Sequence, residues 1–227
     1  YTTNLVKGAP LEVTKKHLQN GLARAVICNS GNANTCNADG IEIAEAMCAL
    51  VEEHTGIPKN DVIVASTGVI GEKLSIEPIK NGMAELAAGL GDHSDLATEA
   101  IMTTDTKPKE IAVSFTVGGV ECRMGGIGKG SRMIHPNMAT MLVVVTCDAA
   151  ITPEMLRKAL SEDVKTSFNM GSVEGDASTN DTYTVMCNGC AGNRVIDSEG
   201  EDFDTFKAAL ATVSRHLSRM IAGDGEG

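Results

Sequence analysis

The residue of this 227-residue chain whose type and position could do the most demanding chemistry is Thr140. It follows Ala139 and directly precedes Met141–Thr146, an apolar run that predicts a β-strand. Its hydroxyl could attack the Ala139 carbonyl and shift the acyl group from nitrogen to oxygen, after which water would break the chain. The new chain would begin with Thr140, whose free α-amine would titrate at about pH 8 and could serve as base for its own hydroxyl. Because most threonines before a strand are simply good strand formers, this local pattern alone favours a structural role.

Two further segments carry groups that would suit acyl transfer. Thr67 and Gly68 follow Asp61–Ala65, which predicts a short buried strand ending in a tight turn. A hydroxyl and a backbone N–H that converge on one point would make an oxyanion hole, although a plain turn is the simpler interpretation. Lys129 lies in the stretch Gly125–Ser131, which lacks the Ser or Thr that follows the lysine of a phosphate-binding P-loop. The stretch therefore predicts a glycine-rich hinge, whose lysine either faces solvent or binds a carboxylate.

The remaining polar clusters have structural interpretations. Thr103, Thr104 and Thr106 form an exposed hydroxyl cluster after a predicted helix. The run Asn29–Asn34 is rich in Asn and Gly, which tolerate left-handed backbone, and predicts a turn that shapes a pocket wall. A self-generated amine would need no second base, so His135 is interpreted as structural.

The sequence predicts no metal site. Glu174, Asp176 and Asp181 do not have the spacing of a calcium-binding loop. Cys187 and Cys190 have the C-x-x-C spacing of redox and zinc sites, but no second Cys pair or His lies nearby, and chance explains the spacing better. The seven cysteines are scattered, mostly within apolar segments, which indicates reduced, buried thiols in a cytoplasmic protein.

A mixture of helices and strands must position these groups. Gly118–Gly119 between two apolar runs predicts an antiparallel hairpin of Ile111–Val117 and Val120–Met124. Such a hairpin beside mixed elements favours an α+β fold over a doubly wound parallel sheet. Further strands are expected at Asp61–Ala65, Met141–Thr146 and Thr182–Cys187. Helices are expected at Ile41–His54, Ile76–Leu90, Ser94–Met102, Pro153–Phe168 with Thr152 as N-cap, and Phe203–Ile221.

Length and composition exclude several classes of protein. The chain is long enough for one large or two small domains, and with no Trp, two Tyr and four Phe its core must be aliphatic. A net charge of −11 argues against nucleic-acid and anionic-membrane partners. No apolar run approaches the roughly 20 residues of a membrane span. The chain opens without a Met and is expected to be a piece of a longer product.

Several long segments together resemble one enzyme family in order and spacing. They are Asn29–Asn34, Ala65–Gly71, Met102–Lys109, Gly125–Ser131 and Gly175–Thr182, and the resemblance extends from Thr2–Asn4 to Asp224–Gly227. These segments are similar to the signature segments of the ornithine acetyltransferase family, the glutamate N-acetyltransferases of arginine biosynthesis. The resemblance implies a layered αββα sandwich, in which helices pack outside two central mixed sheets.

The resemblance also implies a self-cleaving acetyltransferase that needs no metal or organic cofactor. Thr140 would take the acetyl group from N2-acetylornithine and pass it to glutamate, in a ping-pong reaction through acetyl-threonine. Thr67 and Gly68 would form the oxyanion hole. Some members of the family also accept acetyl-CoA as donor. Arg132 stands where the family has a small residue and leaves the details of the glycine-rich loop open. The implied substrate-binding residues are Thr106, Lys129, Thr140 and Glu226.

The implied organisation is two chains made from one. Residues 1–139 would form the α-chain part, and residues 140–227 would form a β-chain part that is shorter at its C-terminus than the family pattern. The αβ units would pair into a dimer. Two alternatives stay open. With water as acceptor, the same threonine would give an amidase or aminopeptidase of related fold, and a chain that neither cleaves nor holds an acetyl group would be an inactive fragment.

Overall fold

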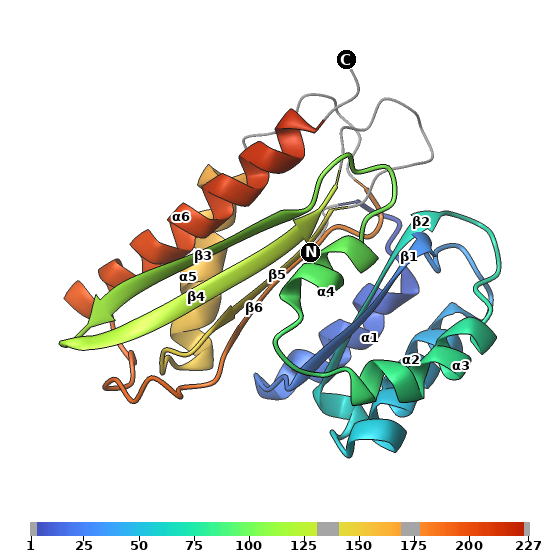
Figure 1. The fold of residues 1–227 in the computed structure, drawn as a ribbon, viewed down its shortest axis with the longest axis horizontal. Coiled ribbons are helices and arrows are strands. Elements are labelled where there is room, and N and C mark those ends of the chain that lie inside the picture. The colour runs from blue at the N-terminus through green and yellow to red at the C-terminus, as the bar shows by residue number, and fades with distance from the viewer. Residues whose placement is uncertain (1–3, 131–140, 169–177, 225–227) are drawn as a thin grey trace.

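Six strands in two sheets organise the part of the chain that the computed structural model describes, residues 4–130, 141–168 and 178–224 (Figure 1). Strands β1 (Ala25–Asn32) and β2 (Val62–Val69) pair in parallel. The second sheet has the order β3-β4-β5-β6, in which β6 runs parallel to β5 and the other neighbours are antiparallel. Its strands are β3 (Lys109–Val117), β4 (Val120–Lys129), β5 (Leu142–Cys147) and β6 (Thr182–Cys187).

Helices pack around both sheets. Helices α1 and α2 contact β2, and α3 packs on α2. On the other side of the molecule, α5 and α6 lie against the four-stranded sheet, with α6 across β3 and β4 (Figure 1). The α+β class expected from the sequence is therefore confirmed. The helices are α1 (Ala9–His17), α2 (Gly40–Thr55), α3 (Glu77–Ala88), α4 (Ser94–Ala100), α5 (Pro153–Thr166) and α6 (Glu201–Gly223), with short 3-10 turns at Leu18–Asn20 and Lys59–Asp61.

Local sequence signals set several element boundaries as expected. Gly118 and Gly119 both have positive φ, +55° and +82°, which only a glycine adopts easily, and they form the turn between β3 and β4. The Thr152 hydroxyl accepts the N–H of Met155 at 3.3 Å and caps α5. The hairpin and this cap are confirmed. Seven further predicted elements are confirmed within two residues at each end: the helices at 41–54, 76–90, 94–102, 153–168 and 203–221, and the strands at 141–146 and 182–187.

Two segments expected as turns are strands instead. Residues 29–32 belong to β1, and Thr67 and Gly68 belong to β2, because each strand supplies the other's hydrogen-bond partners. Gly31 lies opposite Gly68, and a Cβ built on Gly68 would lie 2.1 Å from the carbonyl carbon of Gly31. The two strands can approach this closely only because a glycine stands at position 68, where φ is +128°.

The glycine-rich stretch expected as a hinge is also strand. Residues 125–129 form the second half of β4, between β3 and β5. A Cβ built on Gly126 would lie 3.0 Å from the side chains of Val213 and Leu217 on α6. The glycines therefore serve close packing of a helix on a strand, and they do not mark a loop.

The apolar core has two parts, one on each sheet, and it is mainly aliphatic as expected. Residues of both sheets line one cavity of about 30 Å³, Val26 and Ala65 from the small sheet and Ile127 and Leu142 from the large sheet. Ala65, in the middle of β2, and Leu142, at the start of β5, therefore line the same cavity.

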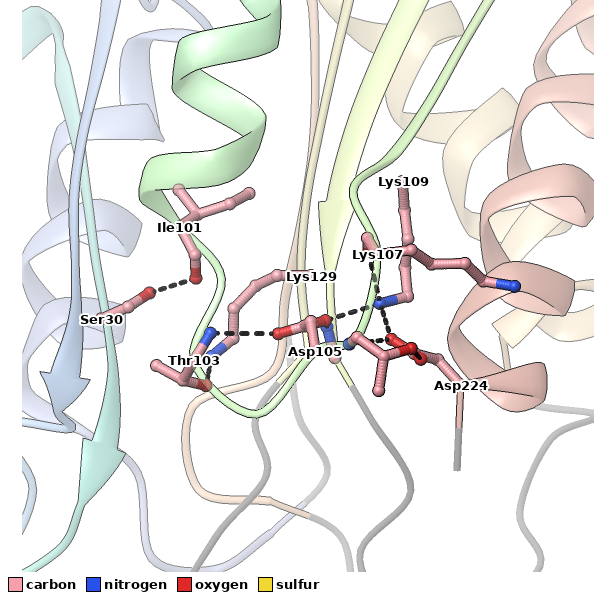
Figure 2. Close-up of polar contacts among 10 residues, drawn as sticks. Ser30, Ile101, Thr103, Asp105, Lys107, Lys109, Lys129 and Asp224 are labelled. Carbon is pink, nitrogen blue, oxygen red and sulfur yellow. Dashed lines mark hydrogen bonds and ion pairs between the residues drawn. The ribbon is translucent and has the colours of Figure 1, made fainter. Parts of the chain in front are cut away.

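A buried ion cluster joins the end of α6 to the segment before β3 (Figure 2). Lys109 Nζ lies 2.6 Å from Asp105 Oδ1 and 2.5 Å from Asp224 Oδ2, and the three side chains are at most 2% exposed. The backbone N–H and the hydroxyl of Thr106 also donate to Asp224. Burial would raise the pKa of Asp224, but the hydrogen bonds from Lys109 and Thr106 outweigh it and lower the pKa to about 2.

We predict that Lys109→Met lowers the free energy of unfolding at pH 7 by about 3–5 kcal/mol, because it leaves two buried carboxylates without a cation. Urea denaturation measures the loss. Lys16→Met is the matched control: Lys16 also pairs with a carboxylate, that of Glu45 at 3.0 Å, but its side chain is 68% exposed. Its removal should change stability by at most about 1 kcal/mol. Equal losses in the two variants would contradict the structural role given to Lys109.

Candidate active site

Lys129 is a buried cation at the end of β4, with 3% of its surface exposed. Its Nζ donates a hydrogen bond to Thr103 Oγ1 at 2.9 Å (Figure 2). Among the described residues it forms no ion pair with a carboxylate within 4.0 Å. Burial lowers the pKa of Lys129, while the more distant Asp105 carboxylate opposes the shift. An ammonium group has three N–H donors, so Lys129 is suited to receive a carboxylate that enters from outside.

Cys28 of β1 lies close enough to Lys129 for their charges to interact. Burial raises the pKa of this thiol to about 11, although the neighbouring ammonium opposes the shift. The thiol therefore stays protonated near neutral pH and supplies no negative charge to Lys129.

Asp105 holds the backbone at two points near Lys129. Its carboxylate accepts the N–H of Thr103 at 3.2 Å and the N–H of Gly130 at 2.8 Å. Burial would raise the pKa of Asp105, but hydrogen bonds from Lys109, Gly130 and Thr103 outweigh it and hold the pKa below its usual range. The ion cluster thus holds the backbone of Thr103 and of Gly130, the residue that follows Lys129.

Of the predicted hydroxyl cluster, the structure brings Thr103 to Lys129. Thr106, the member expected to bind substrate, instead has its N–H and its hydroxyl bonded to Asp224. The sequence contained the cluster but no signal to choose within it, because the choice depends on where the end of β4 meets this segment. We add Thr103 to the candidate binding residues on this geometry.

Thr67 lies on β2 and is fully buried. Its hydroxyl donates to Ser30 Oγ of β1 at 3.2 Å, and the Ser30 hydroxyl donates to the carbonyl of Ile101 at 2.6 Å. These hydrogen bonds end at Ile101, two residues before Thr103, and Figure 2 shows the bond from Ser30 to Ile101. The backbone of residues 101–103 completes the connection from Thr67 to the Lys129–Thr103 pair. Ser30 was expected only to shape a turn and is a further member of the site.

The strand that follows the predicted nucleophile begins beside Lys129. Lys129 pairs with Leu142 across β4 and β5, and a Cβ built on Gly130 would lie 3.7 Å from the Cα of Met141. Thr140 immediately precedes Met141 and lies outside the described residues, as do Arg132, His135 and Glu226. Met141, the first described residue after Thr140, therefore lies beside the end of β4 that carries Lys129.

Both polar backbone groups of Met141, its N–H and its carbonyl, are hydrogen-bonded. Asp181 Oδ1 accepts the Met141 N–H at 3.0 Å, and the Met141 carbonyl accepts the N–H of Thr182 at 2.9 Å. Burial raises the pKa of Asp181 to about 6, although the Met141 N–H opposes the shift. Asp181 was weighed from the sequence only as a calcium ligand, and its contact with Met141 depends on the pairing of β5 with β6.

Within the described ranges, no three His, Cys, Asp or Glu side chains gather in a way that could hold a metal ion. All seven cysteines are free thiols, including Cys187 and Cys190. No helix in the described part combines the length and apolar character that crossing a bilayer requires. The arrangement offers a buried ammonium and a hydroxyl group near the start of β5, and a Thr-Gly pair packed closely against β1. Such groups can bind a carboxylate and stabilise the oxyanion of an attacked carbonyl.

Known proteins with similar sequences and structures carry one family name. The family model described as ArgJ family matches residues 1–227. The chain is 47% identical over 230 residues to the arginine biosynthesis bifunctional protein ArgJ 1 of Clostridium acetobutylicum, covering all of this chain and 56% of that protein. It is 48% identical over 229 residues to the ArgJ of Symbiobacterium thermophilum, covering all of this chain and 57% of that protein. The chain thus spans little more than half the length of these curated relatives.

Two solved structures are similar. The crystal structure of the arginine biosynthesis bifunctional protein ArgJ from Bacillus halodurans has 40% identity and a TM-score of 0.54, over 63% of this chain and 74% of that one. The ornithine acetyltransferase of Mycobacterium tuberculosis, solved in complex with ornithine, has 31% identity and a TM-score of 0.51, over 63% of this chain and 75% of that one. With a family model that matches its whole length, the chain belongs to the ArgJ family.

Proposed function

We propose that this chain carries the acyl-transfer site of an acetyltransferase that moves the acetyl group from N2-acetylornithine to glutamate in arginine biosynthesis. The observation that carries the proposal is Lys129, a buried ammonium whose hydrogen-bond partner among the described residues is the Thr103 hydroxyl. It lies beside the start of β5 and is linked through Thr103 and Ser30 toward Thr67. Both substrates are amino acids with a free carboxylate, which is the group that a buried ammonium binds best.

The proposed reaction is ping-pong with one covalent intermediate. The Thr140 hydroxyl attacks the acetyl carbonyl and passes its proton to the Thr140 α-amine. The Thr67 hydroxyl turns from Ser30 Oγ and, with the Gly68 N–H, stabilises the negative charge on the carbonyl oxygen. The α-amine returns the proton to the leaving nitrogen, ornithine departs, and the α-amine of glutamate attacks acetyl-threonine to release acetylglutamate. Lys129 with Thr103 holds the substrate carboxylate, and we retain Thr106 and Glu226 as proposed binding residues.

The proposal extends to the organisation of the protein. Residues 1–139 and 140–227 are the α-chain and β-chain parts, formed by cleavage between Ala139 and Thr140. The architecture is a layered αββα sandwich, the αβ units pair into a dimer, and the enzyme works in the cytoplasm. The bifunctional name of the relatives supports acetyl-CoA as a second acetyl donor.

One prediction of this proposal concerns Thr140. The protein, expressed from its complete reading frame, should give two masses under denaturing conditions that sum to the uncleaved mass plus one water. Thr140→Ala should give one mass and no acetyl transfer, because it lacks both the attacking hydroxyl and the amine that cleavage frees. Thr146→Ala, on strand β5, is the control and should cleave normally. Transfer that survives in Thr140→Ala would refute the nucleophile assignment.

Product analysis separates transfer from hydrolysis. With N2-acetylornithine and glutamate, a transferase makes acetylglutamate, and without glutamate it stops at one acetyl group per site. An amidase would release acetate at the same rate with or without glutamate. That second result would replace the transferase proposal by its alternative.

The second prediction concerns the binding pair. Lys129→Met should raise the KM for N2-acetylornithine by about 10- to 100-fold, because a hydrogen bond to a charged group contributes about 1.5–3 kcal/mol. Thr103→Val should raise the same KM by a smaller factor. Thr106→Val should mainly lower the free energy of unfolding, since its hydroxyl is bound to Asp224. A KM that rises in Thr106→Val but not in Thr103→Val would make Thr106, and not Thr103, the partner of Lys129 in substrate binding.

A further inference from the structure

Asn180 is a buried amide that joins three separate segments of the chain. It is 1% exposed and precedes β6. Its Nδ2 donates to the carbonyl of Ala33, just after β1, at 2.7 Å and to the carbonyl of Ser66, within β2, at 2.9 Å. Its Oδ1 accepts the hydroxyls of Thr35 and Thr179, each at 2.6 Å.

These contacts use the whole hydrogen-bonding capacity of the side chain. A carboxamide has two N–H donors and one oxygen with two lone pairs, and all four are occupied. The orientation of the amide is fixed, because exchanging nitrogen and oxygen would place the oxygen against two carbonyl groups. Gly8 packs directly against this side chain, so closely that a Cβ at position 8 would lie 2.5 Å from Asn180 Nδ2. The side chain therefore has one position available to it.

One of these contacts acts directly on the candidate oxyanion hole. The Ser66 carbonyl belongs to the same planar peptide group as the N–H of Thr67. Holding that carbonyl fixes the plane of the peptide that leads into Thr67 and Gly68. Asn180 touches neither the Thr67 hydroxyl nor the substrate pair Lys129–Thr103, so its effect on them is exerted through the backbone.

The next residue makes the matching contact on the opposite side. Asp181 Oδ1 accepts the N–H of Met141 at 3.0 Å, and the N–H of Thr182 donates to the Met141 carbonyl at 2.9 Å. Asn180 thus holds the peptide before Thr67 in the small sheet. Its neighbour Asp181 holds Met141, the residue before β5, in the large sheet. A dipeptide spans about 7 Å, so the two held groups are kept at a nearly constant separation.

We infer that Asn180 and Asp181 form a positioning bridge that sets the oxyanion-hole strand β2 relative to the start of β5. The inference rests on the proposed function for the identity of the two sides. The bridge acts on the rate of acyl transfer, because a nucleophile and an oxyanion hole must meet in one geometry, and a misplacement of about 1 Å can cost about 100-fold. It leaves substrate affinity to Lys129 and Thr103.

The test compares Asp181→Ala with Asp181→Asn in the protein expressed from its complete reading frame. Asparagine keeps an oxygen that can accept the Met141 N–H, whereas alanine does not. We expect Asp181→Ala to lower kcat by about 100-fold with KM within a factor of about three, and Asp181→Asn to keep kcat within a factor of about three. If Asp181→Asn loses as much as Asp181→Ala, the carboxylate acts as an acid or base and the positioning inference is overturned.

Asn180→Ala supplies the other half of the test, with Asn193→Ala as its matched control. Asn193 is also buried, 6% exposed, and its side chain makes three hydrogen bonds, but these are to Ala150 and Arg194 beyond the far end of β5. Asn180→Ala should lower kcat by about 10- to 100-fold, while Asn193→Ala should lose comparable stability with kcat unchanged. Equal kcat in the two variants would overturn the inference.

A readout that needs no activity separates this inference from the proposed function. Amide hydrogen exchange at residues 66–69 should become faster in Asn180→Ala than in Asn193→Ala, and exchange at residues 141–143 faster in Asp181→Ala than in Asp181→Asn. If the wild-type protein transfers no acetyl group, the proposed function fails while the exchange pattern still tests the bridge. If transfer occurs but the exchange rates of the paired variants are equal, the bridge alone fails.

Discussion

The described structure depends on how buried charge is matched between residues that are far apart in the sequence. Carboxylates stabilise the charge of a lysine that is excluded from water, and Lys109 is held by Asp105 and Asp224. Asp105 also accepts hydrogen bonds from the backbone N–H groups of Thr103 and Gly130. The cluster that joins α6 to the segment before β3 therefore also positions the backbone near Lys129. Both carboxylates are thereby committed to Lys109 and to backbone groups. Lys129 is left as the buried cation that a ligand can match.

Several of the contacts described above join the parts of the chain before and after the proposed cleavage point. Asp224 and Asn180 belong to the second part of the chain, and Lys109, Ala33 and Ser66 belong to the first. Strands β4 and β5 pair along six register positions, with one strand from each part. A cut between residues 139 and 140 would therefore break one covalent bond and leave an ion pair, a sheet and a buried amide to hold the parts together.

The sequence alone predicted the elements that depend on neighbours in the chain. Gly118–Gly119 predicted the hairpin of β3 and β4, and Thr152 predicted the N-cap of α5. The apolar spacing of residues 41–54 predicted helix α2. Prediction from the sequence failed where a distant partner decides. Residues 29–32 of β1 were interpreted as a turn because the partner strand β2 starts 30 residues later, and the glycines of β4 were interpreted as a hinge because α6 lies almost 90 residues beyond. For the site, the residue types of Thr67 and Lys129 were visible, but their roles came from family resemblance. Ser30, Thr103 and Asn180 became site residues only once the fold was known.

The sequence separation of the contacts around Asn180 has a kinetic consequence. Its hydrogen bond to Ala33 joins residues 147 positions apart, and its bond to Ser66 joins residues 114 positions apart. Contacts of such length form late, because the chain must close a large loop before they contribute any stability. A geometry that requires them is absent from partly folded molecules and complete only in folded ones. Chemistry that depends on this geometry would report that folding has finished, so that a molecule trapped on the way would keep its backbone intact.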